Sequence, residues 1–126
     1  LALGQSDTES IETECLQLFM SLATLLNLPV RNDPFNIVDF GNRLRHATDG
    51  RVAYLMKLLF AALRKALLQD LQVIDVALLE QAFTEEIWRG GVGKLNPFNA
   101  DFDFRPLDRG GEPFERAHTG GRRGRR

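Results

Sequence analysis

Residues 50–69 read GRVAYLMKLLFAALRKALLQ, and this stretch decides the fold class. Apolar side chains recur in it at the three- and four-residue spacing of an α-helix and predict a helix over the whole stretch. Such a helix is apolar nearly all round and must be buried on several sides. Because its neighbours are short, we expect the side that carries Tyr54, Leu58 and Phe60 to stay exposed, as a patch that a partner surface covers.

The same periodicity predicts the rest of an all-α fold, a small four-helix bundle. Three further helices are expected, over residues 8–26, 36–47 and 76–88. Ser6 and Glu9 have the spacing of a capping box at the start of the first helix, and Asp75 is a plausible N-cap for the last. The pair Val73-Ile74 is too short to form more than a β-bridge.

The overall composition limits the class of protein. It is 44% hydrophobic and 26% charged, which excludes disorder over the full length. The single cysteine, Cys15, lies on an apolar helix face, and we interpret it as a core residue. The sequence contains no signal peptide pattern and no apolar run near the ~18 residues that span a bilayer, so a cytoplasmic protein without a membrane partner is expected. It starts at Leu1 rather than Met, as a piece of a longer protein would.

The helical pattern stops after Trp88. Most of the glycines and three of the five prolines follow it, so we expect a helical domain over residues 1–88 and a flexible tail over 89–126. Two groups of tail residues have features of nucleic-acid binding, arginines for the phosphate backbone and phenylalanines for stacking on bases. These are Arg122, Arg123, Arg125 and Arg126, and Phe98, Phe102, Phe104 and Phe114. The alternative is a tail that only adds solubility, or residues beyond the true end of a gene.

No catalytic constellation is visible in the sequence. It contains no GxxxxGK[ST] phosphate loop, and no apolar strand ends in the paired acidic residues that hold magnesium. His46 lies near a helix C-terminus, where it favours the helix dipole, and His118 lies in the tail. We therefore expect no enzymatic activity, no metal site and no cofactor bound by this chain alone.

The order of the motifs resembles the lid of an AAA+ ATPase, and more narrowly the C-terminal part of TniB proteins, ATPases that act in DNA transposition. The resemblance covers roughly residues 8–88. It is carried by Leu26-Asn27-Leu28-Pro29, Thr48-Asp49-Gly50-Arg51-Val52, the helix through Leu67, and Val73-Ile74-Asp75 with Leu78-Leu79. Asn96-Pro97-Phe98 also resembles the C-terminal ends of some relatives.

In lids of this kind, the turn before the long helix carries the sensor 2 arginine, usually three residues after the glycine. That position is Ala53 here, and Arg51 follows Gly50 directly. The resemblance therefore implies that Thr48, Gly50 and Arg51 lie near the nucleotide, with Arg51 approaching it from the first helical turn. The alternative is that Arg51 is only an exposed arginine at a helix start.

The resemblance also implies a function and a set of partners. The lid would close over ATP and Mg²⁺ bound by an αβ core domain, and would couple nucleotide state to assembly of a homo-oligomer on DNA. The implied partners are that core domain, a DDE-type transposase and a TniQ-type protein. The rival hypothesis is a free-standing helical interaction module with an Arg/Gly nucleic-acid-binding tail. A helix-turn-helix DNA binder is disfavoured, because Tyr54, Leu58 and Phe60 occupy faces that a groove-reading helix fills with polar groups.

Overall fold

The fold consists of helices, as the periodicity predicts. In the computed structural model, the backbone is described for residues 3–116 and the side chains for residues 14–116. The helices are α1 (Leu3–Leu25), α2 (Ile37–Thr48), α3 (Val52–Leu68), α4 (Val76–Ala82), the π-helix η1 (Phe83–Ile87) and the short 3₁₀-helix η2 (Gly93–Leu95). Within this part of the chain, β-pairing is limited to one parallel bridge between Val30 and Ile74, in agreement with the expectation that Val73-Ile74 forms no more than a β-bridge.

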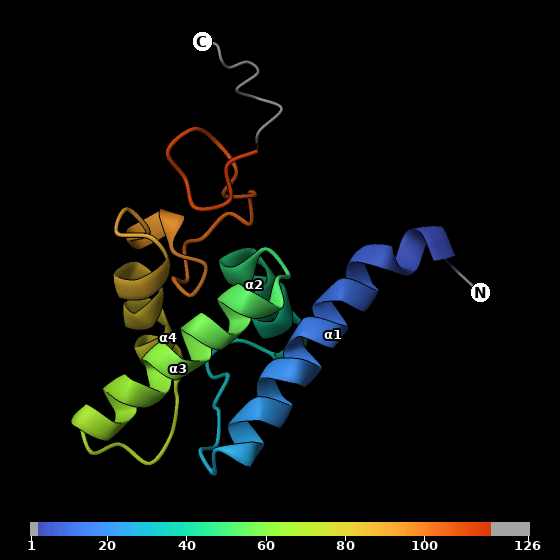
Figure 1. The fold of residues 1–126 in the computed structure, drawn as a ribbon. Coiled ribbons are helices and arrows are strands. Elements are labelled where there is room, and N and C mark those ends of the chain that lie inside the picture. The colour runs from blue at the N-terminus through green and yellow to red at the C-terminus, as the bar shows by residue number, and fades with distance from the viewer. Residues whose placement is uncertain (1–2, 117–126) are drawn as a thin grey trace.

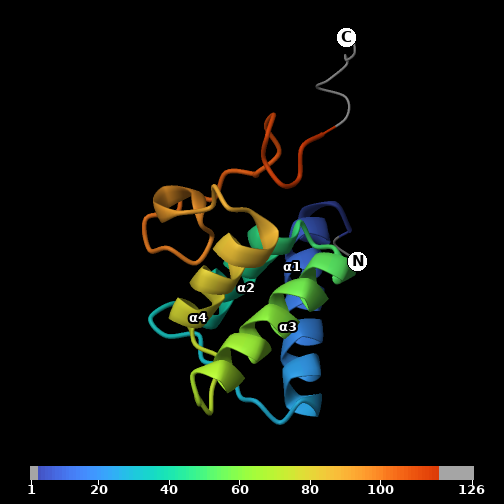
Figure 2. The same cartoon turned by 60° about the vertical axis from the view of Figure 1, so that its left-hand side comes forward.

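The long helix α3 lies in the middle of the bundle. It contacts α1 and α2 on one side and α4 with η1 on the other, while α1 also packs on α2 (Figures 1 and 2). The chain after η1 passes above α4 and α2 (Figure 1), and its described part ends with Arg116 near the turn that joins α2 to α3. Both faces of α3 that the sequence marks as apolar therefore have neighbours along much of their length.

Two of the helices begin at side-chain caps. Asn36 accepts a hydrogen bond from the backbone N–H of Asp39 at 2.8 Å, and Asp75 accepts one from Leu78 at 2.9 Å. The predicted N-cap at Asp75 is confirmed. The predicted capping box at Ser6 is wrong, because α1 already begins at Leu3 and Ser6 lies inside the helix.

The last predicted helix is divided into two parts. Regular α-helix ends at Ala82, and the chain continues as a π-helix to Ile87 rather than as one helix to Trp88. The wider turn leaves the Glu80 carbonyl to accept a hydrogen bond from the side-chain amide of Asn96 at 2.9 Å. A residue from the expected tail thus bonds to this helix where its geometry changes.

Residues 89–116 differ most from the sequence-based expectation. Instead of forming a flexible tail, they pack on the helices and bury four large side chains, Phe98, Phe102, Leu107 and Phe114. Their burial is the physical reason for the difference, since apolar side chains that face α2 and α3 fix the segment without any helical periodicity of its own. The ten residues that follow, with the four predicted nucleic-acid arginines, lie outside the described residues.

Arg43 holds this segment against α2. Its side chain is 5% exposed, and its guanidinium donates hydrogen bonds to the backbone carbonyls of Pro97, at 3.1 Å, and Asn99. It also pairs with Asp39 at 3.0 Å and lies 3.7 Å from the ring centre of Phe35. A buried cation with this many partners is strongly fixed, because any one lost partner leaves charge uncompensated in the core.

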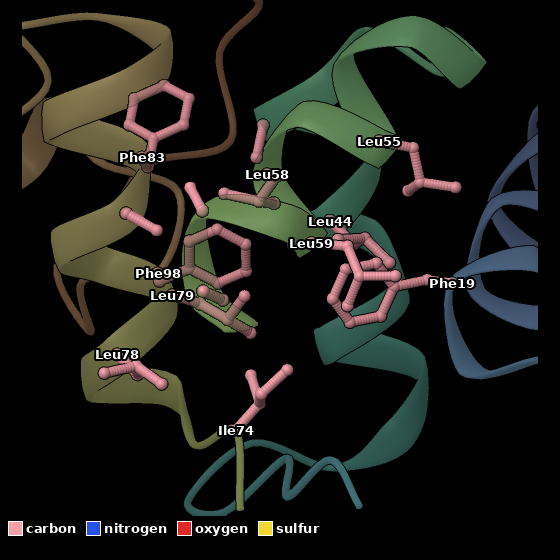
Figure 3. Close-up of a cluster of buried hydrophobic side chains, with 14 of the residues drawn as sticks. Phe19, Leu44, Leu55, Leu58, Leu59, Ile74, Leu78, Leu79, Phe83 and Phe98 are labelled. Carbon is pink, nitrogen blue, oxygen red and sulfur yellow. The ribbon is translucent and has the colours of Figure 1, made fainter. Parts of the chain in front are cut away.

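The packed segment overturns the exposed patch expected on α3. Leu58 is fully buried, and Figure 3 shows it in the cluster that also contains Phe83 and Phe98. Tyr54 is half-buried, with the Phe114 ring edge-on at 5.1 Å between centres. Only Phe60, at 43% exposure, lies at the surface as expected.

The burial of Leu58 predicts opposite results for two substitutions on one helix. Leu58→Lys places a charge among apolar side chains and should cost about 5 kcal/mol, comparable to the whole stability of a small domain. Phe60→Lys on the exposed side should cost less than about 1 kcal/mol. Urea denaturation followed by circular dichroism measures both. A folded Leu58→Lys variant, as stable as Phe60→Lys, would contradict the packing described here.

Candidate functional site

The turn between α2 and α3 is held by a buried threonine. Thr48 is 0% exposed, and its hydroxyl donates to the Leu44 carbonyl at 3.0 Å while accepting from the Gly50 N–H at 3.2 Å. Asp49 and Gly50 then take left-handed backbone conformations, with φ of 56° and 68°. The conformation is easy for glycine and tolerable for aspartate, which explains these residue types in the turn.

A pocket of about 420 Å³ opens beside this turn. Its walls come from α1, from the end of α2, from the turn and first turns of α3, and from the end of the described chain. The lining residues are Glu14, Cys15, Leu18, Arg45, Asp49, Gly50, Arg51, Val52, Leu55 and Arg116. Of the three site residues that the resemblance implies, Gly50 and Arg51 line the pocket, and Thr48 lies behind its wall, 3.6 Å from the Cys15 sulfur.

The pocket is rich in arginine. Arg45, Arg51 and Arg116 face two carboxylates, those of Glu14 and Asp49. The Asp49 carboxylate is shared, since one oxygen lies 3.1 Å from Arg51 Nε and the other 3.5 Å from an Arg116 nitrogen. The pocket therefore carries a net positive charge that Asp49 partly neutralises.

Arg45 differs from the other two arginines. It projects from the last turn of α2, lines the pocket and is partly buried, whereas the Arg51 side chain is solvent-exposed. Its Nε is buried and donates no hydrogen bond to any residue that the structure describes. Arg45 was not among the site residues predicted from the sequence, although its place three residues before Thr48 puts it on the same side of the helix as the turn.

The N-terminus of α3 adds a second source of positive potential. Arg51 occupies the N-cap position with extended backbone and without a side-chain cap. Since no side chain caps the first turn, its free N–H groups and the positive end of the helix dipole lie beside the pocket wall formed by Val52. An anionic group is the ligand that this end of a helix favours.

Cys15 forms the apolar floor near Thr48. It is buried, which confirms its interpretation as a core residue. Burial raises the pKa of the thiol, and the hydrogen bond with Thr48 and the positive charge of Arg45 only partly oppose this rise. The thiol is therefore protonated at neutral pH and is not arranged as a nucleophile.

The loop that carries Arg116 to the pocket is closed by a partly buried ion pair. Arg105 makes a bidentate contact with the Glu112 carboxylate, in which Nη1 lies 2.9 Å from Oε1 and Nη2 donates to Oε2. The N–H of Phe114 donates to the Leu107 carbonyl at 3.0 Å, which completes the loop. The hydrogen bonds from Arg105 lower the pKa of the Glu112 carboxyl.

The aromatic residues expected to stack on bases are used for packing instead. Phe98, Phe102 and Phe114 are buried, and Phe104 lies against Phe102 and His46. His46 contacts both of these rings edge-on and its Nδ1 lies 2.9 Å from the Asn42 carbonyl, so its place is structural, as expected. The base-stacking role proposed for these phenylalanines from the sequence is wrong, because their rings form part of the core.

Comparisons with protein-family models, with curated protein sequences and with solved structures find no match to this chain. The resemblance to TniB proteins thus depends on the sequence motifs alone. Within the described residues, no helix is long and apolar enough to cross a membrane, and no group of three or more His, Cys, Asp and Glu side chains is placed to hold a metal ion.

The raised pKa of Cys15 predicts slow thiol chemistry. At pH 7.5 the native chain should react with a disulfide reagent at least about tenfold more slowly than the urea-unfolded chain, whose thiol has an ordinary pKa near 8.5. The native rate should rise only at higher pH. Absorbance of the released thiolate follows the reaction, and equal native and unfolded rates at pH 7.5 would show that the thiol is accessible and ionised.

The ion pair of Glu112 predicts a pH-dependent contribution to stability. Because its folded pKa is lowered, the pair stabilises the fold above the unfolded carboxyl pKa of about 4.3, and this contribution is lost as the pH falls through the folded pKa. Glu112→Gln should cost about 1–2 kcal/mol at pH 7 and progressively less below pH 4. Urea titrations at several pH values measure the difference. Glu115→Gln, at an exposed carboxylate, is the control, and a cost for Glu112→Gln that does not change with pH would contradict the assignment.

Proposed function

We propose that the described helices are the lid of a TniB-like AAA+ ATPase, which closes over ATP and couples nucleotide state to assembly on DNA. The observation that carries the proposal is the arginine-lined pocket at the turn between α2 and α3. Gly50 and Arg51, which the resemblance places near nucleotide, are both in its walls. The surrounding positive potential suits the phosphates of ATP.

The proposal divides the work between two parts of a longer protein. A phosphate loop and magnesium-binding acidic residues would belong to an αβ core domain, and the lid would supply Arg51 and the α3 N-terminus from above the nucleotide. Closure would then depend on the phosphates present, because the attraction between the lid and the nucleotide grows with phosphate charge. A homo-oligomer on DNA, a DDE-type transposase and a TniQ-type protein are the partners proposed by resemblance.

A second candidate function is favoured by the burial of Leu58. A core that closes around Leu58 without a further domain is what a free-standing interaction module needs. In that case the exposed apolar side chains of α3, among them Val52, Met56 and Phe60, would bind a protein partner. The two candidates differ in whether the pocket or the apolar surface is the functional feature.

A chimaera tests the lid proposal. Residues 3–116 replace the lid of a TniB-like ATPase, and ATP hydrolysis and DNA-dependent assembly are compared with those of the same core without a lid. The chimaera should restore hydrolysis, and Arg51→Glu should lower its apparent affinity for ATP about 10–100-fold, since hydrogen bonds to charged groups contribute roughly 1.5–3 kcal/mol.

Arg64→Glu is the matched control, because Arg64 is an exposed arginine of the same helix and pairs with Glu86 outside the pocket. It should leave hydrolysis unchanged. A chimaera whose helical content is intact, but which hydrolyses ATP no faster than the lidless core, would contradict the lid proposal and favour the interaction module.

A further inference from the structure

We propose that Arg45 is the principal phosphate-binding residue of the pocket, and that Asp49 competes with the phosphate for Arg51 and Arg116. The proposal rests on the proposed function in naming a nucleotide as the source of the phosphate. The anion site itself is built from residues of this chain alone. The main contact with the phosphate then comes from Arg45 of α2 rather than from the turn that the sequence motifs indicate.

Arg45 is the arginine with unused hydrogen-bonding capacity. Its Nε is buried without an acceptor among the described residues, and no ion pair is made by its side chain there. An arginine without an ion-pair partner can pair with an incoming oxyanion directly, whereas an arginine that is already paired must first give up its partner. The planar guanidinium also fits two phosphate oxygens at once.

The Arg45 side chain is directed at the pocket. Its positive charge lowers the pKa of the Cys15 thiol against the larger effect of burial, which places the guanidinium near the pocket floor. It also lines the smaller cavity of about 90 Å³ between α2 and the loop that ends at Arg116. A phosphate in the larger pocket would therefore meet Arg45 at its inner end and the N-terminus of α3 at its rim.

Asp49 partly neutralises the other two arginines. Its two carboxylate oxygens lie near Arg51 and Arg116, and Arg116 also lies 3.7 Å from an Asp108 oxygen. Arg51, with 53% of its side chain exposed, loses little on changing partners. An incoming phosphate is repelled by the Asp49 carboxylate and must share Arg51 and Arg116 with it. Asp49 therefore lowers the affinity of the pocket for phosphate.

The size and walls of the pocket favour a nucleotide over a bare ion. A volume of about 420 Å³ is within the range of small-molecule sites, and Leu18, Val52 and Leu55 give it an apolar wall. Such a wall suits the less polar part of a nucleotide, while the arginines receive its phosphates. A nucleic-acid backbone offers the same phosphate chemistry and is the competing source.

The experiment titrates the whole 126-residue chain with inorganic pyrophosphate at low ionic strength, followed by ³¹P NMR. Arg45→Gln should weaken binding about tenfold or more, and Asp49→Asn should tighten it about three- to tenfold. Asparagine tolerates the left-handed conformation of position 49, so this variant changes charge without straining the turn. Arg64→Gln, outside the pocket, should leave binding unchanged.

Three results overturn the proposal. The proposal is contradicted if Arg45→Gln binds pyrophosphate as tightly as the natural chain, if Asp49→Asn binds it no more tightly, or if a short oligothymidylate competes better than ATP. If Arg45→Gln loses its helical circular dichroism, the direction of the Asp49→Asn effect decides. Failure of the chimaera with intact pyrophosphate binding removes the lid proposal alone, whereas loss of the Arg45 effect in a working chimaera removes only the present inference.

Discussion

The buried guanidinium of Arg43 is the interaction on which the rest of the structure depends. A cation in the core requires compensating partners, and two of those are backbone carbonyls of a segment more than fifty residues away in the sequence. The hydrogen bonds that Arg43 donates to these carbonyls therefore hold residues 97–99 against α2. Once they are there, Phe98 enters the core beside Leu58, and α3 gains the cover that the helices alone do not supply.

The pocket is a consequence of the same constraint. After Phe98 the chain continues through Phe102 and Phe104 against His46, and the pair of Arg105 and Glu112 closes the loop that follows. That loop ends with Arg116 close to Asp49, at the turn that Thr48 holds from the other side. The charge distribution around the pocket thus depends on packing contacts made well outside it.

The parts of the fold that follow local rules were predictable from the sequence. Periodic apolar residues located α2, α3 and α4, and the Asp75 cap was found from its short-range pattern. Residues 89–116 have no such period. Their order depends on Arg43 and Asn96, single polar side chains whose partners are distant in sequence, and a composition rich in glycine and proline gave the opposite expectation. For the site, the motifs located Gly50 and Arg51, whereas Arg45 and Arg116 required the tertiary structure.

The apolar surface that remains on α3 connects the two candidate functions. Leu58 is covered, but Val52, Met56 and Phe60 follow one another at four-residue spacing and are 55%, 37% and 43% exposed, so they form one stripe along the helix. Val52 belongs both to this stripe and to the pocket wall. A surface that packs along the stripe therefore approaches the pocket and excludes water from it, which strengthens every contact between the arginines and a phosphate. A bound phosphate in turn reduces the cost of desolvating those arginines beneath the covering surface. In the proposed lid, nucleotide and partner would then favour each other through one shared side chain, as the proposed coupling between ATP and an assembling oligomer requires.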